Sequence, residues 1–542
     1  MRPTILILAL AAMAMDRDIA AANTTAAPSP EPGELLLRWR FLGQAQLSGD
    51  TNAACFRNIW ALATTQRLAQ ETLRKLARAP QQLCKEALAT PNADLSPLLR
   101  PLLDDLLQGE SFGECRAGAG PTPEWTLAVK LDEARGERWG ANLRQVLAAF
   151  GASVPADAKA QSWEAKRAAA PDRFGLARAG QWLVLGWGQG ALPNHAEVVN
   201  RLKAAGRPAA ANAAWLEVEA NLSWLAKELQ WPAGIKWPQA HLTTIGRGAN
   251  LRTSGRLTFA EPLRLRIEPW RIPTNTIRER LISFSGVQGV GGWLAQQPWL
   301  QQVGLEPAPN QVFGWAQKQV PFETYLAWSL PDALRKLPRV AQRLPGLIKT
   351  NWPWLGVREV NWDTNVAQVT CLGLPIIRPF LQPAPAPEND FLVAGIFPVS
   401  SMKQPPGPPE LYAQLLGRTN LVYYDWEETQ SRLEDWRHLL TIYSMVRGYR
   451  PPGTNDPALV WLADTNMTGW LTNSITEVTL TSPRELLLTR ASSLGLTGFE
   501  LVTLGRWLDN PAFPAYVPPP LAGRRPAGAP PPRPAPPAAP KP

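Results

Sequence analysis

The feature of this 542-residue chain that most constrains its fold is an internal repeat. Five short landmarks recur further along the chain in nearly the same order, at nearly constant spacing. Each match alone is weak evidence, but such an ordered set is hard to obtain by chance. The matched pairs are Phe112-Gly113 with Phe313-Gly314, 126–131 (TLAVKL) with 325–330 (YLAWSL), 182–186 (WLVLG) with 391–395 (FLVAG), Gly206-Arg207 with Gly417-Arg418, and 215–219 (WLEVE) with 421–425 (LVYYD).

The matched landmarks lie in elements of the same predicted type. Short apolar runs typical of strands lead into helical patterns at 133–150 and at 331–348, and prolines at 338 and 345 predict a break in the second helix. Each copy ends in a β-rich stretch, at 241–259 and at 475–503. We therefore expect an α+β fold of two tandem, pseudo-symmetric repeats, each a mainly antiparallel or mixed sheet with helices packed on it.

The first copy is longer than the second because helical patterns at 53–77 and 96–107 precede its Phe-Gly landmark. We interpret residues from about 53 to 110 as a helical insertion. The expected organisation is a signal peptide (1–22), a linker (23–34), the first repeat (35–265), the second repeat (266–512) and a proline-rich basic tail (513–542).

The N-terminus predicts export. A basic start at Arg2 is followed by an apolar run from Ile5 to Met15, which is too short to cross a membrane but suits a signal peptide. The small residues Ala20 and Ala22 favour cleavage after position 22 over the alternative site at Ala12 and Ala14. We expect a periplasmic or extracellular protein, with no membrane span in the mature chain.

The C-terminal tail and the charge pattern limit the classes of partner. Residues 511–542 hold 14 prolines in 32 residues, a composition that predicts a disordered segment with local polyproline II structure. The net charge is +10, but lysines and arginines are scattered among acidic residues rather than clustered with aromatic residues. The pattern excludes a typical nucleic-acid-binding protein and favours an anionic polymer or another envelope protein as partner.

Cysteine and histidine usage argues against a metal site. The chain has 3 histidines and 4 cysteines, and none of the histidines has a cysteine or a second histidine at ligand spacing. One disulfide among Cys55, Cys84 and Cys115 is expected in an oxidising compartment, and the sequence does not choose the pair. We expect no cofactor.

The sequence segments that resemble catalytic motifs lack the spacing or the helix that the chemistry needs. The glycine run 186–190 lacks the spacing of a dinucleotide-binding turn, and prolines that follow 400–403 (SSMK) forbid the helix that an S-x-x-K serine enzyme needs. His195, His241 and His438 are interpreted as surface or capping residues. Adjacent carboxylates such as Glu427 and Glu428 diverge on a helix and cannot act on one bond.

Tryptophan is unusually abundant, with 24 residues. Most lie in apolar runs and are expected to pack in the core or between repeats. Trp352, Trp354 and Trp362 could instead form an exposed aromatic strip that stacks on sugar rings.

The segments GRTNLVYYDWE (417–427), EPWRIPTN (268–275) and IGRGANLRTSGRLTF (245–259) resemble large exported bacterial proteins that have no assigned activity. The resemblance implies an envelope setting and no catalytic residues. The sequence thus favours a non-enzymatic binding or scaffold protein of the bacterial envelope. The alternative is a secreted hydrolase acting on an envelope polymer or polysaccharide, with carboxylates that the sequence does not pair.

Overall fold

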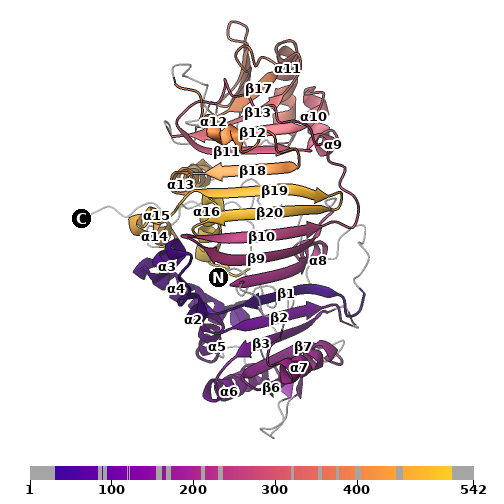
Figure 1. The fold of residues 1–542 in the computed structure, drawn as a ribbon, viewed down its shortest axis with the longest axis vertical. Coiled ribbons are helices and arrows are strands. Elements are labelled where there is room, and N and C mark those ends of the chain that lie inside the picture. The colour runs from indigo at the N-terminus through magenta and orange to yellow at the C-terminus, as the bar shows by residue number, and fades with distance from the viewer. Residues whose placement is uncertain are drawn as a thin grey trace, which may run out of the picture.

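In the residues that it describes, the computed structural model contains one large antiparallel sheet of 20 strands, with 15 helices packed around it. Figure 1 shows the sheet running along the long axis of the molecule. The residues that the structure describes are 31–83, 88, 94–118, 120, 122–153, 162–165, 172–208, 214–229, 236–318, 323–351, 357–373, 378–396, 404–446 and 456–515. Within this part of the chain, no helix is long and apolar enough to cross a membrane.

Ten strands come from the first half of the chain. They are β1 (Leu35–Phe41), β2 (Ser111–Arg116), β3 (Glu124–Lys130), β4 (Ala152–Ser153), β5 (Ser162–Ala165), β6 (Asp172–Ala179), β7 (Trp182–Gln189), β8 (Leu216–Asn221), β9 (Gln239–Arg247) and β10 (Asn250–Thr258). Their pairings give the order β4-β5-β6-β7-β3-β2-β1-β8-β9-β10.

Ten further strands come from the second half. They are β11 (Leu281–Gln288), β12 (Gln311–Gln317), β13 (Thr324–Ser329), β14 (Glu359–Asp363), β15 (Gln368–Leu372), β16 (Phe380–Pro383), β17 (Phe391–Gly395), β18 (Leu421–Glu427), β19 (Ser474–Ser482) and β20 (Glu485–Ser492). They pair in the order β14-β15-β16-β17-β13-β12-β11-β18-β19-β20. β10 pairs with β20 in the middle and joins the halves into one sheet (Figure 1).

The strand register corrects one of the matches made in the sequence. Arg40 lies opposite both Phe112 and Glu217, and Gly286 lies opposite both Phe313 and Tyr424. When the two Phe-Gly landmarks are aligned, Glu217 therefore corresponds to Tyr424. The match of 215–219 with 421–425 is one residue out of register, which would place every side chain on the wrong face of the sheet. Neither segment contains a glycine or proline that would have fixed the alignment, so the one-residue shift could not be recognised from the sequence.

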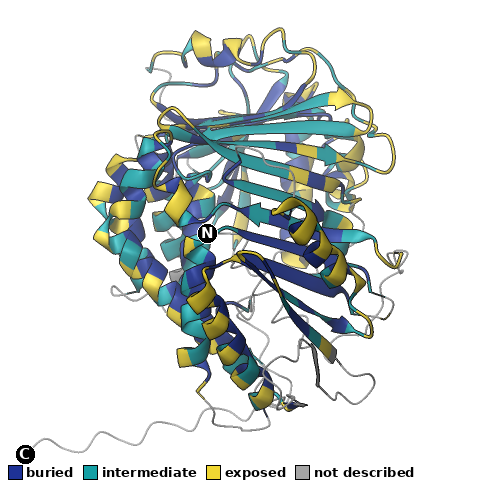
Figure 2. Ribbon diagram, turned by 60° about the horizontal axis from the view of Figure 1, so that its bottom comes forward, coloured by how far each residue is buried: buried dark blue, intermediate teal, exposed yellow. Residues whose placement is uncertain are grey.

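Most helices form a layer on one face of the sheet. This layer contains α3 (Ala54–Ala61), α4 (Ala63–Leu83), α5 (Ser96–Gln108), α6 (Glu133–Ala149), α13 (Thr429–Val446), α14 (Pro457–Ala463), α15 (Thr465–Gly469) and α16 (Gly498–Asp509). Figure 2 shows part of this layer beside the sheet, with exposed residues along its outer side. Its largest apolar core joins Trp39 and Leu127 of the first half to Trp461 and Leu501 of the second. The two predicted repeats therefore do not have separate cores.

The remaining helices are α2 (Gln44–Leu47), α7 (Pro193–Ala205), α8 (Leu222–Glu228), α9 (Gly291–Leu294), α10 (Pro298–Val303), α11 (Ala333–Asn351) and α12 (Pro409–Ala413). On the face opposite to the large helical layer, Val198, Val199 and Leu202 of α7 pack against Phe112 and Val184. Apolar residues of α12 belong in the same way to an aromatic core around Phe284 and Phe313.

One prediction about secondary structure was wrong, and another was correct except at its end. α11 continues through Pro338 and Pro345, because both prolines lie away from its buried stripe and burial of residues such as Leu337 and Val340 offsets their cost. The β-rich stretch predicted at 475–503 contains β19 and β20, and only its last residues, 498–503, belong to a helix, α16. Its start is fixed by a capping box in which Thr497 and Glu500 satisfy each other's backbone N–H groups.

Candidate functional site

A cavity of about 690 Å³ lies between the C-terminal end of α7 and strands β1, β2 and β8. We call it the α7 pocket. The residues that line it are Arg38, Trp39, Arg40, Phe112, Arg201, Ala204, Ala205, Arg207, Pro208, Glu217 and Glu219. Its volume lies in the range of sites that bind small molecules.

The alternation of residues in two neighbouring strands places the charges of the pocket. Arg38 and Arg40 of β1 flank Trp39, whose indole is buried. Because successive side chains of a strand alternate between faces, both arginines lie on the other face of the sheet from that indole. Glu219 and Glu217 of β8 lie directly across from them in the antiparallel ladder. Opposite charges therefore face each other in both cross-strand pairs, an arrangement that stabilises the strand register.

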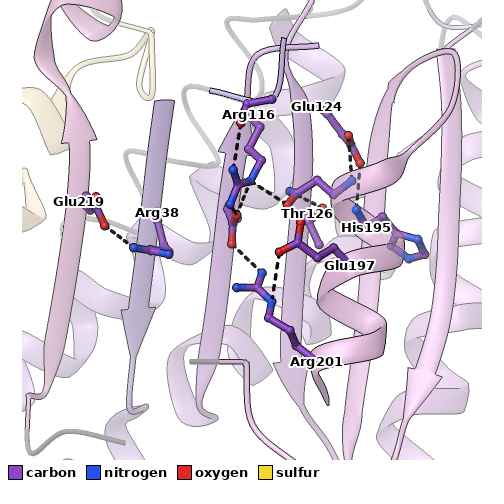
Figure 3. Close-up of polar contacts among 11 residues, drawn as sticks. Arg38, Arg116, Glu124, Thr126, His195, Glu197, Arg201 and Glu219 are labelled. Atoms are coloured by element: carbon purple, nitrogen blue, oxygen red, sulfur yellow. Dashed lines mark hydrogen bonds and ion pairs between the residues drawn. The ribbon is translucent and has the colours of Figure 1, made fainter. Parts of the chain in front are cut away.

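Most of the pocket's arginines are held by carboxylates. Arg38 forms an ion pair with Glu219, and Arg201 donates from Nη2 to Glu114 Oε2 at 2.9 Å (Figure 3). The carboxylate of Glu114 is fully buried and also accepts from Arg116 Nε at 2.5 Å. These ion pairs hold the walls of the pocket in place.

Arg40 is the most enclosed of the pocket's arginines. It donates from Nε and Nη2 to Glu110 Oε1, at 3.0 and 2.8 Å, and the two side chains are only 12% and 10% exposed. Two N–H groups that share one carboxylate oxygen in a part-buried pair hold the guanidinium in place, so Arg40 is not free to move toward a ligand.

Arg207 differs from the other three arginines. It follows Gly206, whose left-handed conformation (φ 67°) ends α7, and its side chain is exposed. Arg207 forms no hydrogen bond or ion pair with any residue that the structure describes. It is therefore the guanidinium of the pocket that is available to a ligand.

The N-terminal end of α7 is fixed by Glu124 of β3. Its two carboxylate oxygens accept the backbone N–H groups of Asn194 and His195, at 3.1 and 2.9 Å. Burial raises the pKa of Glu124, and burial lowers the pKa of His195. The imidazole rests on Gly186, where an added Cβ would lie 2.6 Å from His195 Cβ. His195 thus lies near the helix start, as predicted, and positions α7 (Figure 3).

A second group of polar side chains lies on the face covered by the large helical layer. Ser285 donates to Asp425 Oδ1 at 2.6 Å, and Glu427 accepts the backbone N–H of Gly498 at 2.6 Å. Burial raises the pKa of Asp425, and burial raises the pKa of Glu427 to about 7. Asp425 and Glu427 share a face because they are residues i and i+2 of a strand, whereas the adjacent pair Glu427 and Glu428 does not.

The expected disulfide stays a prediction. Cys55 lies in α3 and Cys115 in β2, and both side chains are buried. Cys84 lies outside the described residues. Burial raises the pKa of the Cys55 thiol and makes it less reactive.

The expected aromatic strip is only partly within the described residues. Trp352 and Trp354 lie outside them, as do residues 400–403 of the S-x-x-K match. Trp362 of β14 packs against the core around α11 and is half-buried. His241 is exposed and contacts Glu217 Oε1 through Nε2 at 3.0 Å, which places it at the edge of the α7 pocket.

The described part of the chain contains no group of three or more His, Cys, Asp or Glu residues that could hold a metal ion. The chain matches no protein-family model, and no curated protein or solved structure is significantly similar to it. The chemistry of the α7 pocket must therefore be judged from its own residues. Its guanidinium groups suit carboxylate or phosphate, and its glutamates can accept hydrogen bonds from hydroxyl groups.

Proposed function

We propose that the two halves are tandem repeats related by a local two-fold axis at the β10–β20 pairing. Ser254 and Thr489 occupy corresponding positions when the halves are aligned through their ladders, and they lie opposite each other. The neighbouring pairs are reciprocal, since Leu251 faces Ser492 while Leu257 faces Leu486. Such reciprocity is the property of an isologous contact between two copies of one unit.

The repeat gives an internal reference for the α7 pocket. Arg38, Glu217 and Glu219 correspond in the ladders to Phe284, Tyr424 and Trp426. Those three residues belong to, or pack against, the aromatic core of the second half. The first half has charged residues and a cavity where the second half has packed rings.

We infer from this contrast that the protein is an exported, non-enzymatic binding protein of the bacterial envelope, and that the α7 pocket takes one unit of an anionic polymer. The observation that carries the proposal is the convergence of four arginines on one cavity, with Arg207 unpaired among the described residues. The other charged side chains of the pocket pair with one another. They therefore do not place a nucleophile and a base against the same substrate atom in this cavity, which suits a binding site better than a catalytic one.

The test is binding of the full chain to immobilised polygalacturonate and polyphosphate, two anionic polymers of different chemistry. Replacing Ala204 and Ala205 by leucine, the residues found at 415 and 416, fills the cavity and should weaken binding at least tenfold. Ala295→Leu, at an exposed position of the second half, is the matched control and should bind normally. Retention of full affinity in the filled variant would refute the proposal.

The alternative of a secreted hydrolase is favoured by one observation. Asp425 and Glu427 lie on one face of β18, with Cα atoms about 7 Å apart by strand geometry. Two carboxylates on one face, one of them with a pKa raised to about 7, are the kind of groups that acid–base cleavage of a glycosidic bond uses. Release of reducing ends from an envelope polysaccharide, lost in both Asp425→Asn and Glu427→Gln, would support the hydrolase over the binding protein.

Export is tested separately. N-terminal sequencing of the protein from an envelope fraction should begin at Asn23, because the small residues at 20 and 22 suit signal-peptide cleavage. An unprocessed chain in the cytosolic fraction would contradict the proposed location and would leave the pocket's ligand class unaffected.

A further inference from the structure

We propose that the α7 pocket recognises a carboxylate-bearing sugar unit and that Arg207 is the residue that binds its carboxylate. The inference rests on the proposed function and specifies its ligand. It follows from three comparisons between the halves of the chain, which concern the arginine, the space beside it and the balance of charge.

The first comparison concerns the arginine. Gly206-Arg207 after α7 corresponds to Gly417-Arg418 after α12, and both glycines have positive φ. Arg418 is neutralised by a bidentate ion pair with Glu477, at 2.6 and 3.1 Å. The ladder position of Glu477, opposite Tyr424, is occupied in the first half by Thr243, opposite Glu217. The first half thus has the arginine without the carboxylate that pairs with it in the second half. A carboxylate of the ligand would occupy the position that corresponds to the Glu477 carboxylate.

Side chains of the second half occupy the space that is open in the first. Counted from the Gly-Arg pair, Ala204 corresponds to Leu415 and Arg201 to Tyr412. Leu415 is fully buried on Gly286, and the Tyr412 ring lies 5.9 Å from Phe284. Alanine at 204 lacks these atoms, while Arg40, the counterpart of Gly286, is drawn aside by Glu110. The cavity in the first half is therefore the volume that side chains fill in the second.

The third comparison is the balance of charge. The four arginines that line the pocket, with Arg116 behind it, face four glutamates, Glu217 and Glu219 in the lining with Glu110 and Glu114 behind it, which leaves one positive charge. One monoanion at Arg207 is accommodated, whereas a dianionic phosphate would meet Glu217 and Glu219. An ammonium group would be repelled by the arginines, so neutral hydroxyl groups are the donors that best suit these glutamates. The ring of Phe112 is only 1% exposed and lies under the Arg201 guanidinium, 5.7 Å from the ring centroid, so it forms the floor of the pocket.

The experiment is calorimetric titration of the full chain with galacturonate, galactose and galactose 6-phosphate, which differ only at carbon 6. Galacturonate should bind most tightly. Arg207→Gln should weaken galacturonate binding at least tenfold, because a charge-assisted bidentate contact is lost. Thr243→Glu should have a similar effect by giving Arg207 the partner that Arg418 already has, at unchanged melting temperature.

Two variants serve as matched controls. Arg418→Gln removes the corresponding arginine of the second half, and Thr243→Gln adds bulk at 243 without charge. Both should keep galacturonate affinity within about twofold of the wild type, since neither removes the free guanidinium.

Several results would overturn the inference. These are equal affinity for galactose and galacturonate, tighter binding of galactose 6-phosphate, or unchanged galacturonate affinity in Arg207→Gln. Binding of polyphosphate that is lost in the cavity-filled variant, without any binding of galacturonate, would keep the proposed function and reject the sugar ligand. If none of the variants weakens binding to polygalacturonate or to polyphosphate, the α7 pocket is not the binding site.

Discussion

Replacing Glu427 by glutamine should stabilise the protein at pH 8 and not at pH 4. The carboxylate is only 5% exposed, lies beside Asp425, and accepts the first backbone N–H of α16. Arg432 on α13 favours its ionised form, but burial dominates and raises its pKa from 4.5 to about 7. Glutamine keeps the acceptor for Gly498 and removes the charge.

The sign and size follow from proton linkage. Because the folded-state pKa of Glu427 is the higher one, the stability that this residue contributes is fully present below pH 4.5 and is lost as the pH rises through about 7. A pKa difference of this size corresponds to about 3 kcal/mol, an upper bound for the gain in Glu427→Gln at pH 8. The orphan amide hydrogens of a buried glutamine reduce the gain to about 1–2 kcal/mol.

Denaturant unfolding of the wild type and Glu427→Gln at pH 4, 6 and 8 measures this difference directly. The neighbouring Glu428, 33% exposed and 3.9 Å from Arg280, is the matched control. Glu428→Gln should change stability by under about 1 kcal/mol, as for a surface ion pair. If Glu427→Gln destabilises the protein, and does so more at pH 8 than at pH 4, then the fold favours the ionised carboxylate, the pKa of Glu427 is lowered and not raised, and the reasoning is wrong.

Two further predictions concern the two halves and the tail. Gly113→Ala should destabilise the protein by about 2 kcal/mol or more, because its Cβ would lie 1.7 Å from the Trp39 ring, whereas Gly314→Ala, 3.3 Å from flexible Leu326, should cost under about 1 kcal/mol. Thermal unfolding of both variants checks the contrast, and equal losses would contradict it. Deletion of 518–542 should leave the melting temperature within about 2 °C, because proline-rich sequence buries little apolar area; a larger fall in calorimetry would mean that the tail packs on the body.

The α+β class and the antiparallel sheet could be predicted from the sequence because both depend on local patterns. Apolar runs such as 126–131 and the helical pattern at 133–150 became β3 and α6 with nearly the expected bounds. Residues 53–110 contain α3, α4 and α5, as their apolar stripes indicated. Local periodicity carries this information without knowledge of the neighbours.

The joining of both halves into one sheet could not be predicted. It depends on β10 meeting β20, a pairing between strands that are far apart in the chain and whose edges give no distinctive signal. The shared core has the same origin, since Trp461 donates from Nε1 to Thr65 across the two halves. Such long-range contacts are set by packing and not by local propensity.

The α7 pocket was missed, although part of its signal was present. Arginines at 38 and 40 and glutamates at 217 and 219 alternate with apolar residues in two strands, which predicts one charged face on each. Only the ladder shows that β1 and β8 are neighbours and that the faces coincide. The significance of Arg207 depends further on Glu477, a residue of the other half.

A crystal structure of the protein bound to galacturonate is the most direct test of the central claim. We expect the carboxylate of galacturonate within 3 Å of the Arg207 guanidinium, a hydrogen-bonding distance for this kind of pair, with sugar hydroxyls donating to Glu217 or Glu219. Binding of galacturonate elsewhere, with the α7 pocket empty, would contradict the account.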